Sequence, residues 1–112
     1  MSLFKRKPKM DFTVPHSDGF KGYKRIKLAT YRDEYAYKGI KELGDRPITT
    51  VGFQIYEDGQ NNCVRVFADG HRIGTIWKHS WTSEYNKIKA GKARAAHVDI
   101  VDPDEVHLYI CL

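Results

Sequence analysis

The stretch that decides the fold is Asn61–Trp77, which reads NNCVRVFADGHRIGTIW. Val64 and Val66 fall on one side of an extended chain and Arg65 falls on the other, as in a half-buried strand. An Asp-Gly pair between two apolar runs is among the strongest short-range signals for a β-hairpin. We therefore predict two antiparallel strands joined by this turn, with Gly74 placed where a side chain would obstruct packing.

Further strands are predicted on both sides of this hairpin. Their shared feature is an alternation of apolar and polar residues, and they cover residues 24–29, 48–56, 96–100 and 106–110. In the first of them, Ile26 and Leu28 are expected to face inward.

Two helices are predicted from their spacing. The first covers Tyr35 to Leu43, with Tyr35, Ile40 and Leu43 as its inward residues, and Gly44 is placed to end it while Gly39 weakens it. The second has its apolar residues at i, i+4 and i+7, with a serine N-cap before them and a glycine stop after them; these are Trp81, Tyr85, Ile88, Ser80 and Gly91.

About six short strands with turn signals between them favour a small barrel. We predict a mainly β, α+β fold: a six-stranded barrel of the OB or SH3 kind with one or two short helices. Residues 1–20 are expected to be a basic, loosely ordered N-terminal arm, because Pro8 and Pro15 interrupt regular structure. Residues 21–112 are expected to form the single barrel domain.

The composition is that of an ordinary globular domain. The chain has 112 residues, of which 41% are hydrophobic and 29% are charged. No run approaches the roughly 18 apolar residues of a membrane span. The basic start leads into Asp11 and Pro15 rather than an apolar run, so we expect no secretory signal and a cytoplasmic protein. Cys63 and Cys111 match no zinc or redox spacing, and we expect reduced, half-buried strand residues, with a disulfide as the alternative.

The formal net charge of +5 is unevenly distributed along the chain. Residues 10–64 carry eight basic and eight acidic side chains, so they are neutral. Residues 65–97 carry seven basic and two acidic side chains, whereas residues 98–112 carry four acidic ones. An electrostatic binding surface is therefore expected at the basic N-terminal arm, or around the hairpin and the helix after it.

The hairpin resembles the core of the HIRAN domain, in which Asn, a small residue and an aliphatic run precede a glycine turn and an Ile-Gly-x-Ile return. The resemblance covers residues 23–110, and its specific motif covers residues 62–78. HIRAN domains fold as six-stranded barrels related in shape to oligonucleotide-binding barrels. They occur fused to chromatin-remodelling helicases, and also alone or beside nucleases in bacterial and phage proteins. Their best understood activity is capture of the 3′ end of single-stranded DNA.

Several residues stand at positions that match this family. Asn62 precedes the small-aliphatic run, Gly74 lies in the return strand, and Lys78 is the basic residue shortly after it. Tyr31-Arg32 lies near the place where the family presents aromatic and basic residues after its first strand. The resemblance thus implies a divergent HIRAN-like domain of the stand-alone bacterial or phage type.

The chain also departs from the family at two places. Members that bind DNA ends carry Asn-Pro-Tyr-Asp just before the motif, and this chain has Glu57-Asp58-Gly59-Gln60 there. Trp77 replaces the proline that follows the return strand. The barrel is therefore expected to be retained more fully than the 3′-end specificity.

A single-strand binding surface combines aromatic faces for bases with Lys or Arg for the backbone. The residues expected to form one here are Asn62, Arg65, Arg72, Trp77, Lys78, Tyr31 and Arg32. His79 and Trp81 interleave with these residues in the sequence. The structural alternatives are that Trp77 closes one end of the barrel, that Trp81 packs under the helix, and that Arg65 and Arg72 are solvated charges.

Catalysis is not expected. The five histidines are scattered singly, without the spacing of a metal site, and no nucleophile signature or phosphate loop is present. We predict no cofactor and no metal. The expected function is a small non-catalytic module that binds single-stranded DNA or RNA. The alternative is a protein-interaction or accessory barrel that has lost the DNA-binding face.

Overall fold

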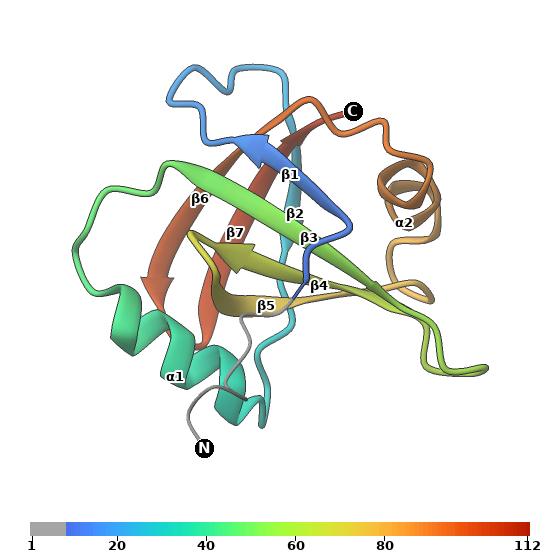
Figure 1. Ribbon diagram of the computed structural model, residues 1–112, viewed down its shortest axis with the longest axis horizontal. Coiled ribbons are helices and arrows are strands. Elements are labelled where there is room, and N and C mark those ends of the chain that lie inside the picture. The colour runs from blue at the N-terminus through green and yellow to red at the C-terminus, as the bar shows by residue number, and fades with distance from the viewer. Residues whose placement is uncertain (1–8) are drawn as a thin grey trace.

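The computed structural model describes residues 9–112, which form seven strands and two helices. The strands are β1 (Phe12–Pro15), β2 (Lys24–Lys27), β3 (Thr50–Tyr56), β4 (Cys63–Ala68), β5 (His71–Trp77), β6 (Ala95–Asp102) and β7 (Glu105–Cys111). The helices are α1 (Glu34–Leu43) and α2 (Thr82–Lys89). The predicted mainly β, α+β class is confirmed. The strands form two antiparallel sheets, in the orders β1-β3-β4-β5 and β2-β7-β6 (Figure 1).

The predicted six-stranded barrel is not confirmed, because the two sheets do not share a continuous ladder. Within the described residues, isolated bridges join them at two corners: His16 lies parallel to Ala96, and Ala29 lies antiparallel to Thr75. A single bridge supplies a few backbone hydrogen bonds, whereas a strand pair supplies a row of them. The sheets are therefore held together mainly by the side chains packed between them.

Strand β1 is the additional strand, and its position falls in the range that was expected to be an arm. Phe12–Pro15 pairs with residues 50–53 of β3, and Val14 is buried. Asp11 strengthens the pairing, since its carboxylate accepts a hydrogen bond of 2.6 Å from the backbone N–H of Ile55. Four residues ending at a proline are too short for a recognisable alternation. The basic residues 5–7 of the expected arm lie outside the described part of the chain.

The predicted hairpin is confirmed, together with its Asp-Gly turn. Asp69 and Gly70 have φ of 47° and 84°, the positive values that a two-residue hairpin turn of this type requires. Val66 lies opposite Gly74 on the return strand. A Cβ at Gly74 would lie 2.7 Å from Cβ of Leu28, so a side chain there would separate β5 from the segment after β2.

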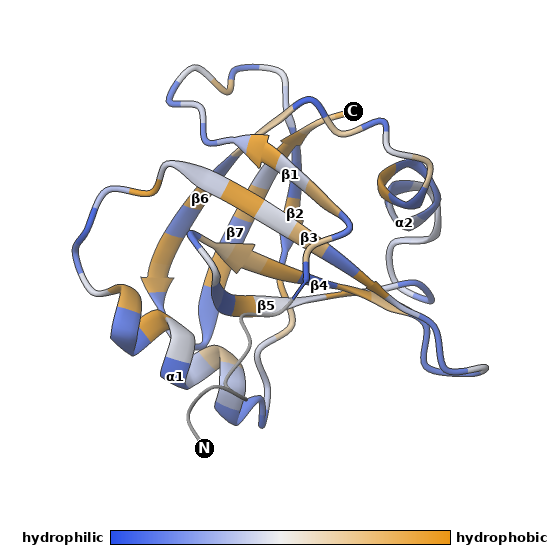
Figure 2. Ribbon diagram, viewed as in Figure 1, coloured by the Kyte–Doolittle hydropathy of each residue, from blue (hydrophilic) through white to orange (hydrophobic). Residues whose placement is uncertain are grey.

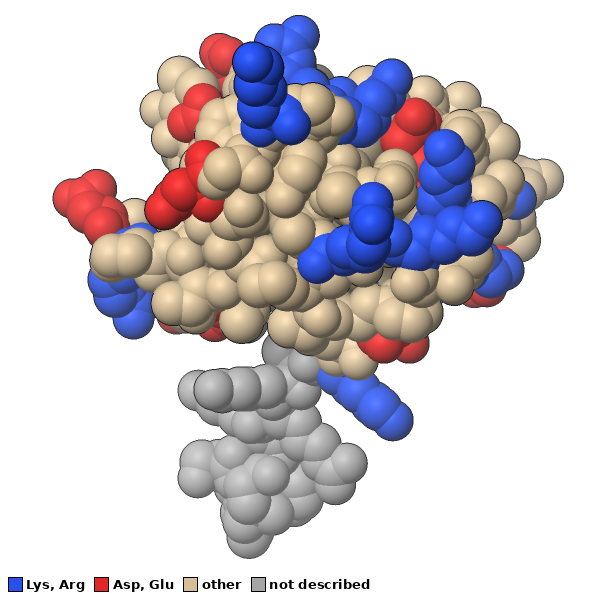
Figure 3. Space-filling model, turned by 90° about the horizontal axis from the view of Figure 1, so that it is seen from above, with Lys and Arg blue, Asp and Glu red and all other residues tan. Residues whose placement is uncertain are grey.

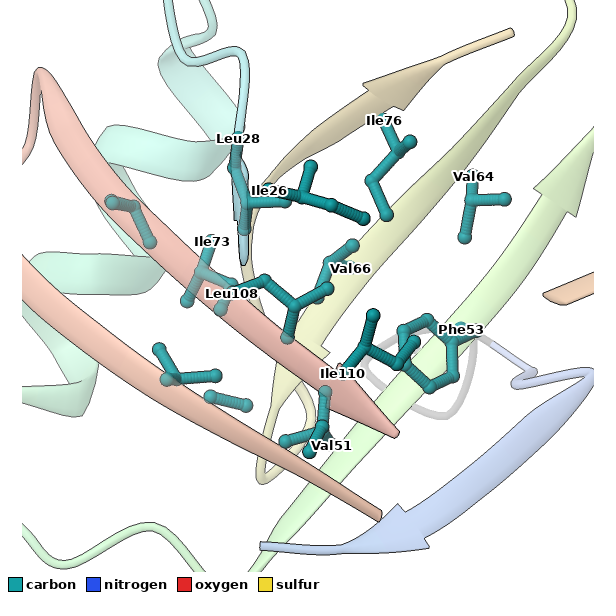
Figure 4. Packing of buried hydrophobic residues seen from close by; sticks show 14 of the residues in the cluster. Ile26, Leu28, Val51, Phe53, Val64, Val66, Ile73, Ile76, Leu108 and Ile110 are labelled. Atoms are coloured by element: carbon teal, nitrogen blue, oxygen red, sulfur yellow. The ribbon is translucent and has the colours of Figure 1, made fainter. Parts of the chain in front are cut away.

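One hydrophobic core lies between the two sheets. Ile26, Leu28, Val51, Phe53, Val64, Val66, Ile73, Ile76, Leu108 and Ile110 are all buried, and their side chains converge from both sheets (Figure 4). The alternation predicted for residues 24–29, 48–56, 96–100 and 106–110 is therefore confirmed, whereas β5 buries Ile73 and Ile76, which are three positions apart. Hydrophobic residues concentrate on the strands, while the connecting loops are mostly hydrophilic (Figure 2).

Helix α1 ends as predicted, and two of its three predicted inward residues are buried. Gly44 follows it with φ of 59°, and Ile40 and Leu43 are buried. The prediction for Tyr35 was wrong, since its side chain is 72% exposed. The buried stripe runs through Ala36, Ile40 and Leu43, and Tyr35 lies beside it rather than on it.

Helix α2 begins one residue later than predicted. Its N-cap position is Trp81, not Ser80, whose Oγ instead lies 3.2 Å from Nδ1 of His79. Tyr85 and Ile88 are buried and Trp81 is partly buried against the core, as the predicted spacing indicated. Gly91 follows the helix with φ of 76°. Neither described helix has the length and apolar character needed to cross a membrane.

Helix α1 packs very closely against strand β5 at Gly39. A Cβ at this position would lie 2.0 Å from the backbone O of Arg72 and 2.8 Å from its N. These are backbone atoms, so they cannot move aside as the end of a flexible side chain would. The glycine that weakens the helix locally is therefore what allows the helix to dock.

We predict that Gly39→Ala destabilises the fold by about 2 kcal/mol or more, because the methyl group forces α1 away from β5. Helix propensity alone predicts the opposite, a stabilisation of about 1 kcal/mol. Urea denaturation of the variant decides between them. Gly19→Ala is the matched control, since a Cβ at Gly19 meets nothing within 4 Å. A Gly39→Ala protein as stable as the parent would contradict the close contact.

Candidate functional site

A surface pocket of about 240 Å³ brings together segments that are far apart in the sequence. Its lining combines the segment after β2 with the two ends of β5, and consists of Ala29, Tyr31, Arg32, Asp33, Arg72, Thr75 and Trp77. We call it the Trp77 pocket. Four of the seven predicted site residues line it: Tyr31, Arg32, Arg72 and Trp77.

The pocket is built on one of the two bridges between the sheets. The N–H of Ala29 donates to O of Thr75 at 2.8 Å, and the N–H of Thr75 donates to O of Ala29 at 3.0 Å. This pair fixes the segment after β2 against β5. Tyr31 and Arg32, two and three residues further on, are therefore carried to the edge of the same strand that bears Arg72 and Trp77.

The Asp33–Arg72 ion pair forms one side of the pocket. Oδ2 of Asp33 lies 3.2 Å from Nη2 of Arg72, and both side chains are largely buried. Oδ1 of Asp33 also accepts the N–H of Ala36 at 3.1 Å, which caps α1. One carboxylate thus holds the start of the helix and orients the guanidinium. Nε of Arg72 is buried and has no hydrogen-bond partner among the described residues.

Tyr31 and Arg32 project from the rim of the pocket into solvent. Tyr31 is 81% exposed, and the Arg32 guanidinium lies over its ring at 5.3 Å from the centroid. Arg32 has φ of 54°, a left-handed conformation that is uncommon for a residue other than glycine. Among the described residues Arg32 forms no ion pair. An exposed aromatic–cation pair on strained backbone is typical of a binding loop.

Trp77 faces outward from its sheet, since its neighbour Ile76 points into the core. It is half-buried and lies near His79, with the two rings 6.1 Å apart and nearly parallel. Its indole therefore lines a surface hollow and does not close the interior of the fold. This position leaves part of the ring accessible to a ligand in the pocket.

The remaining predicted site residues lie elsewhere. Arg65 stacks on Tyr56, with its guanidinium carbon 4.0 Å from the ring centroid. Oδ1 of Asn62 accepts the N–H of Asp58 at 3.0 Å and so stabilises the turn before β4. Nζ of Lys78 lies 5.4 Å from the ring centroid of Tyr85 in α2. None of the three lines the Trp77 pocket.

A second hollow, of about 640 Å³, adjoins the Tyr31–Arg32 segment. It shares Ala29, Tyr31 and Arg32 with the Trp77 pocket and adds Lys27, Leu28, Thr30, Tyr37 and Asp104. The hydroxyl of Tyr37 donates a hydrogen bond of 2.6 Å to Oδ1 of Asp104, and this bond raises the pKa of Tyr37.

Sequence reasoning missed Asp33, Tyr37 and Asp104 as pocket residues. The density of tyrosines between positions 23 and 37 was the available signal. That density fits a binding surface but favours the rim of a small core, and nothing in the order of residues places Asp104 beside Tyr37.

The basic residues of 65–97 do not form one surface. Arg72 lines the Trp77 pocket, whereas Lys87 and Arg94 line a different hollow of about 450 Å³ together with Lys24 and Glu84. Nζ of Lys89 is paired with Oε2 of Glu57 at 2.8 Å. In Figure 3, Lys and Arg side chains are most numerous toward the end of the molecule that carries α2, and Asp and Glu gather toward the opposite end.

Cys63 and Cys111 are both free. Cys63 is buried more deeply than predicted, and this burial raises the pKa of its thiol. Cys111 is half-buried, as expected.

Two histidines that are remote in the sequence meet at the opposite corner of the fold. His16, Asp18 and His97 each offer a nitrogen or oxygen within 4.8 Å of the others, a grouping that no local spacing indicated. Ligands of a tetrahedral zinc ion lie closer, about 3.3 Å apart. Nε2 of His16 already accepts the N–H of Val98 at 3.0 Å, so its lone pair is engaged. We therefore assign no metal to this cluster.

Comparisons with protein-family models, with curated proteins and with solved structures gave no match.

We predict that Asp33→Asn destabilises the protein by about 2 kcal/mol, because it leaves Arg72 without its counter-charge while the asparagine still caps the helix. Asp33→Ala removes the cap as well and is expected to cost about 1 kcal/mol more. Urea denaturation of both variants separates the two contributions. Equal stability of Asp33→Asn and the parent would show that the ion pair does not stabilise the fold.

Proposed function

We propose that this protein is a non-catalytic module that binds single-stranded nucleic acid at the Trp77 pocket. The observation that carries the proposal is the convergence of Tyr31, Arg32, Arg72 and Trp77 on one hollow. Two aromatic and two guanidinium side chains are the combination that single-strand binding uses.

The two kinds of side chain have separate tasks in this proposal. A base stacks on the accessible faces of Trp77 and Tyr31, and each stacked base contributes about 1–3 kcal/mol. Arg32, which has no acidic partner among the described residues, contacts a phosphate. Arg72 is neutralised by Asp33, so it positions the ligand through directed hydrogen bonds more than through net charge.

We also propose that residues 21–112 are a divergent relative of the HIRAN domain, a barrel opened into two sheets, acting in the cytoplasm of a bacterium or encoded by a phage. The order of elements supports this relationship: a strand, a helix, a long strand, the hairpin, a second helix and two closing strands. The bridge between Ala29 and Thr75 supports it further, since it joins the sheets at the edge where a barrel would close.

The alternative proposal is a protein-interaction module. Its specific support is the exposure of Tyr31 and Tyr35, which are 81% and 72% accessible. Tyr31 lies in the turn before α1, and Tyr35 lies in the first turn of that helix. Exposed tyrosines are also frequent anchors of protein interfaces.

Fluorescence anisotropy with a labelled 12-nucleotide DNA and its RNA equivalent tests the first proposal. We expect binding that weakens with salt, with log K falling against log salt with a slope of about −0.7 for the one phosphate that Arg32 contacts. Duplex DNA of the same sequence should bind more weakly, because its bases are already stacked. Absence of single-strand binding at low salt would favour the protein-interaction alternative.

We predict that Tyr31→Ala weakens single-strand binding by about 5-fold to 150-fold through loss of one stacked base, with little change in stability. The side chain is largely exposed, so its removal leaves no cavity. Val101→Ala is the control, since Val101 is 57% exposed on β6 and lines neither pocket. Equal loss in both variants would contradict a role for Tyr31.

We predict that Arg32→Gly weakens binding and lowers the salt dependence, while the free energy of unfolding stays within about 1 kcal/mol of the parent. Glycine accepts the φ of 54° without strain, and this offsets its greater freedom in the unfolded chain. Arg25→Gln removes one positive charge on β2, away from the pocket. It is expected to leave the binding affinity and its salt dependence nearly unchanged. A similar effect from Arg25→Gln would point to nonspecific attraction by net charge.

A further inference from the structure

The corner at which β1 meets β6 depends on two histidine side chains. The N–H of Ser17 donates to O of Ala96 at 2.7 Å, which is the backbone contact. Nε2 of His16 accepts the N–H of Val98 at 3.0 Å. Nδ1 of His97 lies 2.9 Å from O of Ser17 and donates to it. We call these five residues the β1–β6 junction.

The two imidazoles also contact each other. Their ring centroids are 4.7 Å apart, and the ring of Phe20 stacks on that of His97 with a centroid distance of 4.0 Å. Both histidines are half-buried. Their hydrogen bonds have opposite requirements: His97 needs a proton on Nδ1, whereas His16 needs an unprotonated Nε2. The junction is therefore complete only while His16 is neutral.

We propose that the β1–β6 junction is an acid-sensitive latch: protonation of His16 breaks its bond to Val98 and releases residues 16–20 from β6. The proton would occupy the lone pair that accepts the Val98 N–H, so two N–H groups would face each other. A positive imidazolium would also lie against the ring of His97. Opening leaves O of Ala96 and N–H of Val98 on the free edge of β6.

Titratable groups from three elements face His16. His97 comes from β6, Asp18 from the loop after β1, and Asp69 from the turn between β4 and β5. Asp18 is 98% exposed, so solvent screens its attraction for a charged His16. Asp99 lies two residues beyond His97 on β6 and is also exposed. The uncharged Tyr109 of β7 lies beside His97, with the rings 6.0 Å apart.

The balance of these groups favours the neutral form of His16. Burial lowers the pKa of His16 below its ordinary value of 6.5, and His97 lowers it further, whereas Asp18, the backbone contact with Val98 and Asp69 raise it by less, so the net direction is downward. The opened state binds a proton at the ordinary pKa and the closed state at a lower one. The contribution of His16 to closure is therefore fully present above pH 6.5. As the pH falls below this value, the equilibrium constant for closing decreases by up to about tenfold per pH unit.

Hydrogen exchange followed by NMR between pH 7.5 and 5.0 tests the latch. We expect the protection factor of the Val98 amide to fall by up to about tenfold per pH unit below pH 6.5, while the Leu28 amide, bonded to Val106, keeps its protection. The midpoint should coincide with the titration of the His16 ring. A Val98 protection factor that does not depend on pH, or one that changes apart from the His16 titration, would overturn the proposal.

His16→Gln is the decisive variant. Its amide oxygen replaces Nε2 as the acceptor for Val98 and does not titrate in this range, so Val98 should stay protected to pH 5.0. His71→Gln is the matched control, because His71 lies at the start of β5 outside the junction, and it should retain the pH dependence of the parent. If His16→Gln retained that dependence too, His16 would not be the switch. If the variant folds poorly, the unmodified protein still tests the proposal, because the loss of Val98 protection must follow the titration of the His16 ring.

Discussion

The approach of Gly39 to the backbone of Arg72 is the contact on which the rest of the arrangement depends. It lets α1 lie directly against β5, where Asp33 at the start of the helix reaches the Arg72 guanidinium. The segment that precedes the helix is then held close to the strand. Together with the Ala29–Thr75 bridge, this docking places Tyr31 and Arg32 beside Trp77.

The basic side chains that lie close together in the sequence are separated in the folded protein. Along the sequence, residues 65–97 are the basic part of the chain, but in space their side chains are divided between two separate hollows and an ion pair with Glu57. The cation most available at the Trp77 pocket is Arg32, which lies outside that range. Local geometry, and not the net charge of a segment, therefore determines where an anionic ligand would meet the protein.

Much of the fold could be predicted from the order of residues. The Asp69-Gly70 turn, the inward faces of the strands and the ends of both helices at Gly44 and Gly91 depend on local backbone preferences and on alternation. Strand β1 was missed because four residues carry too little pattern. The inward assignment of Tyr35 failed because an aromatic residue near a helix start can lie on either side of the buried stripe.

The candidate site was predictable in part. Arg72 and Trp77 could be selected by residue type, and Tyr31 and Arg32 through the resemblance to the HIRAN domain. Asp33, Tyr37 and the pairing of His16 with His97 could not be predicted. The sequence by itself determined which segments are strands and helices and which of their faces are apolar, since those properties depend on near neighbours. Only the tertiary structure decided that two sheets meet at single bridges and which side chains share a hollow. The reason is that these contacts join residues tens of positions apart, whose approach is set by how helices and sheets pack.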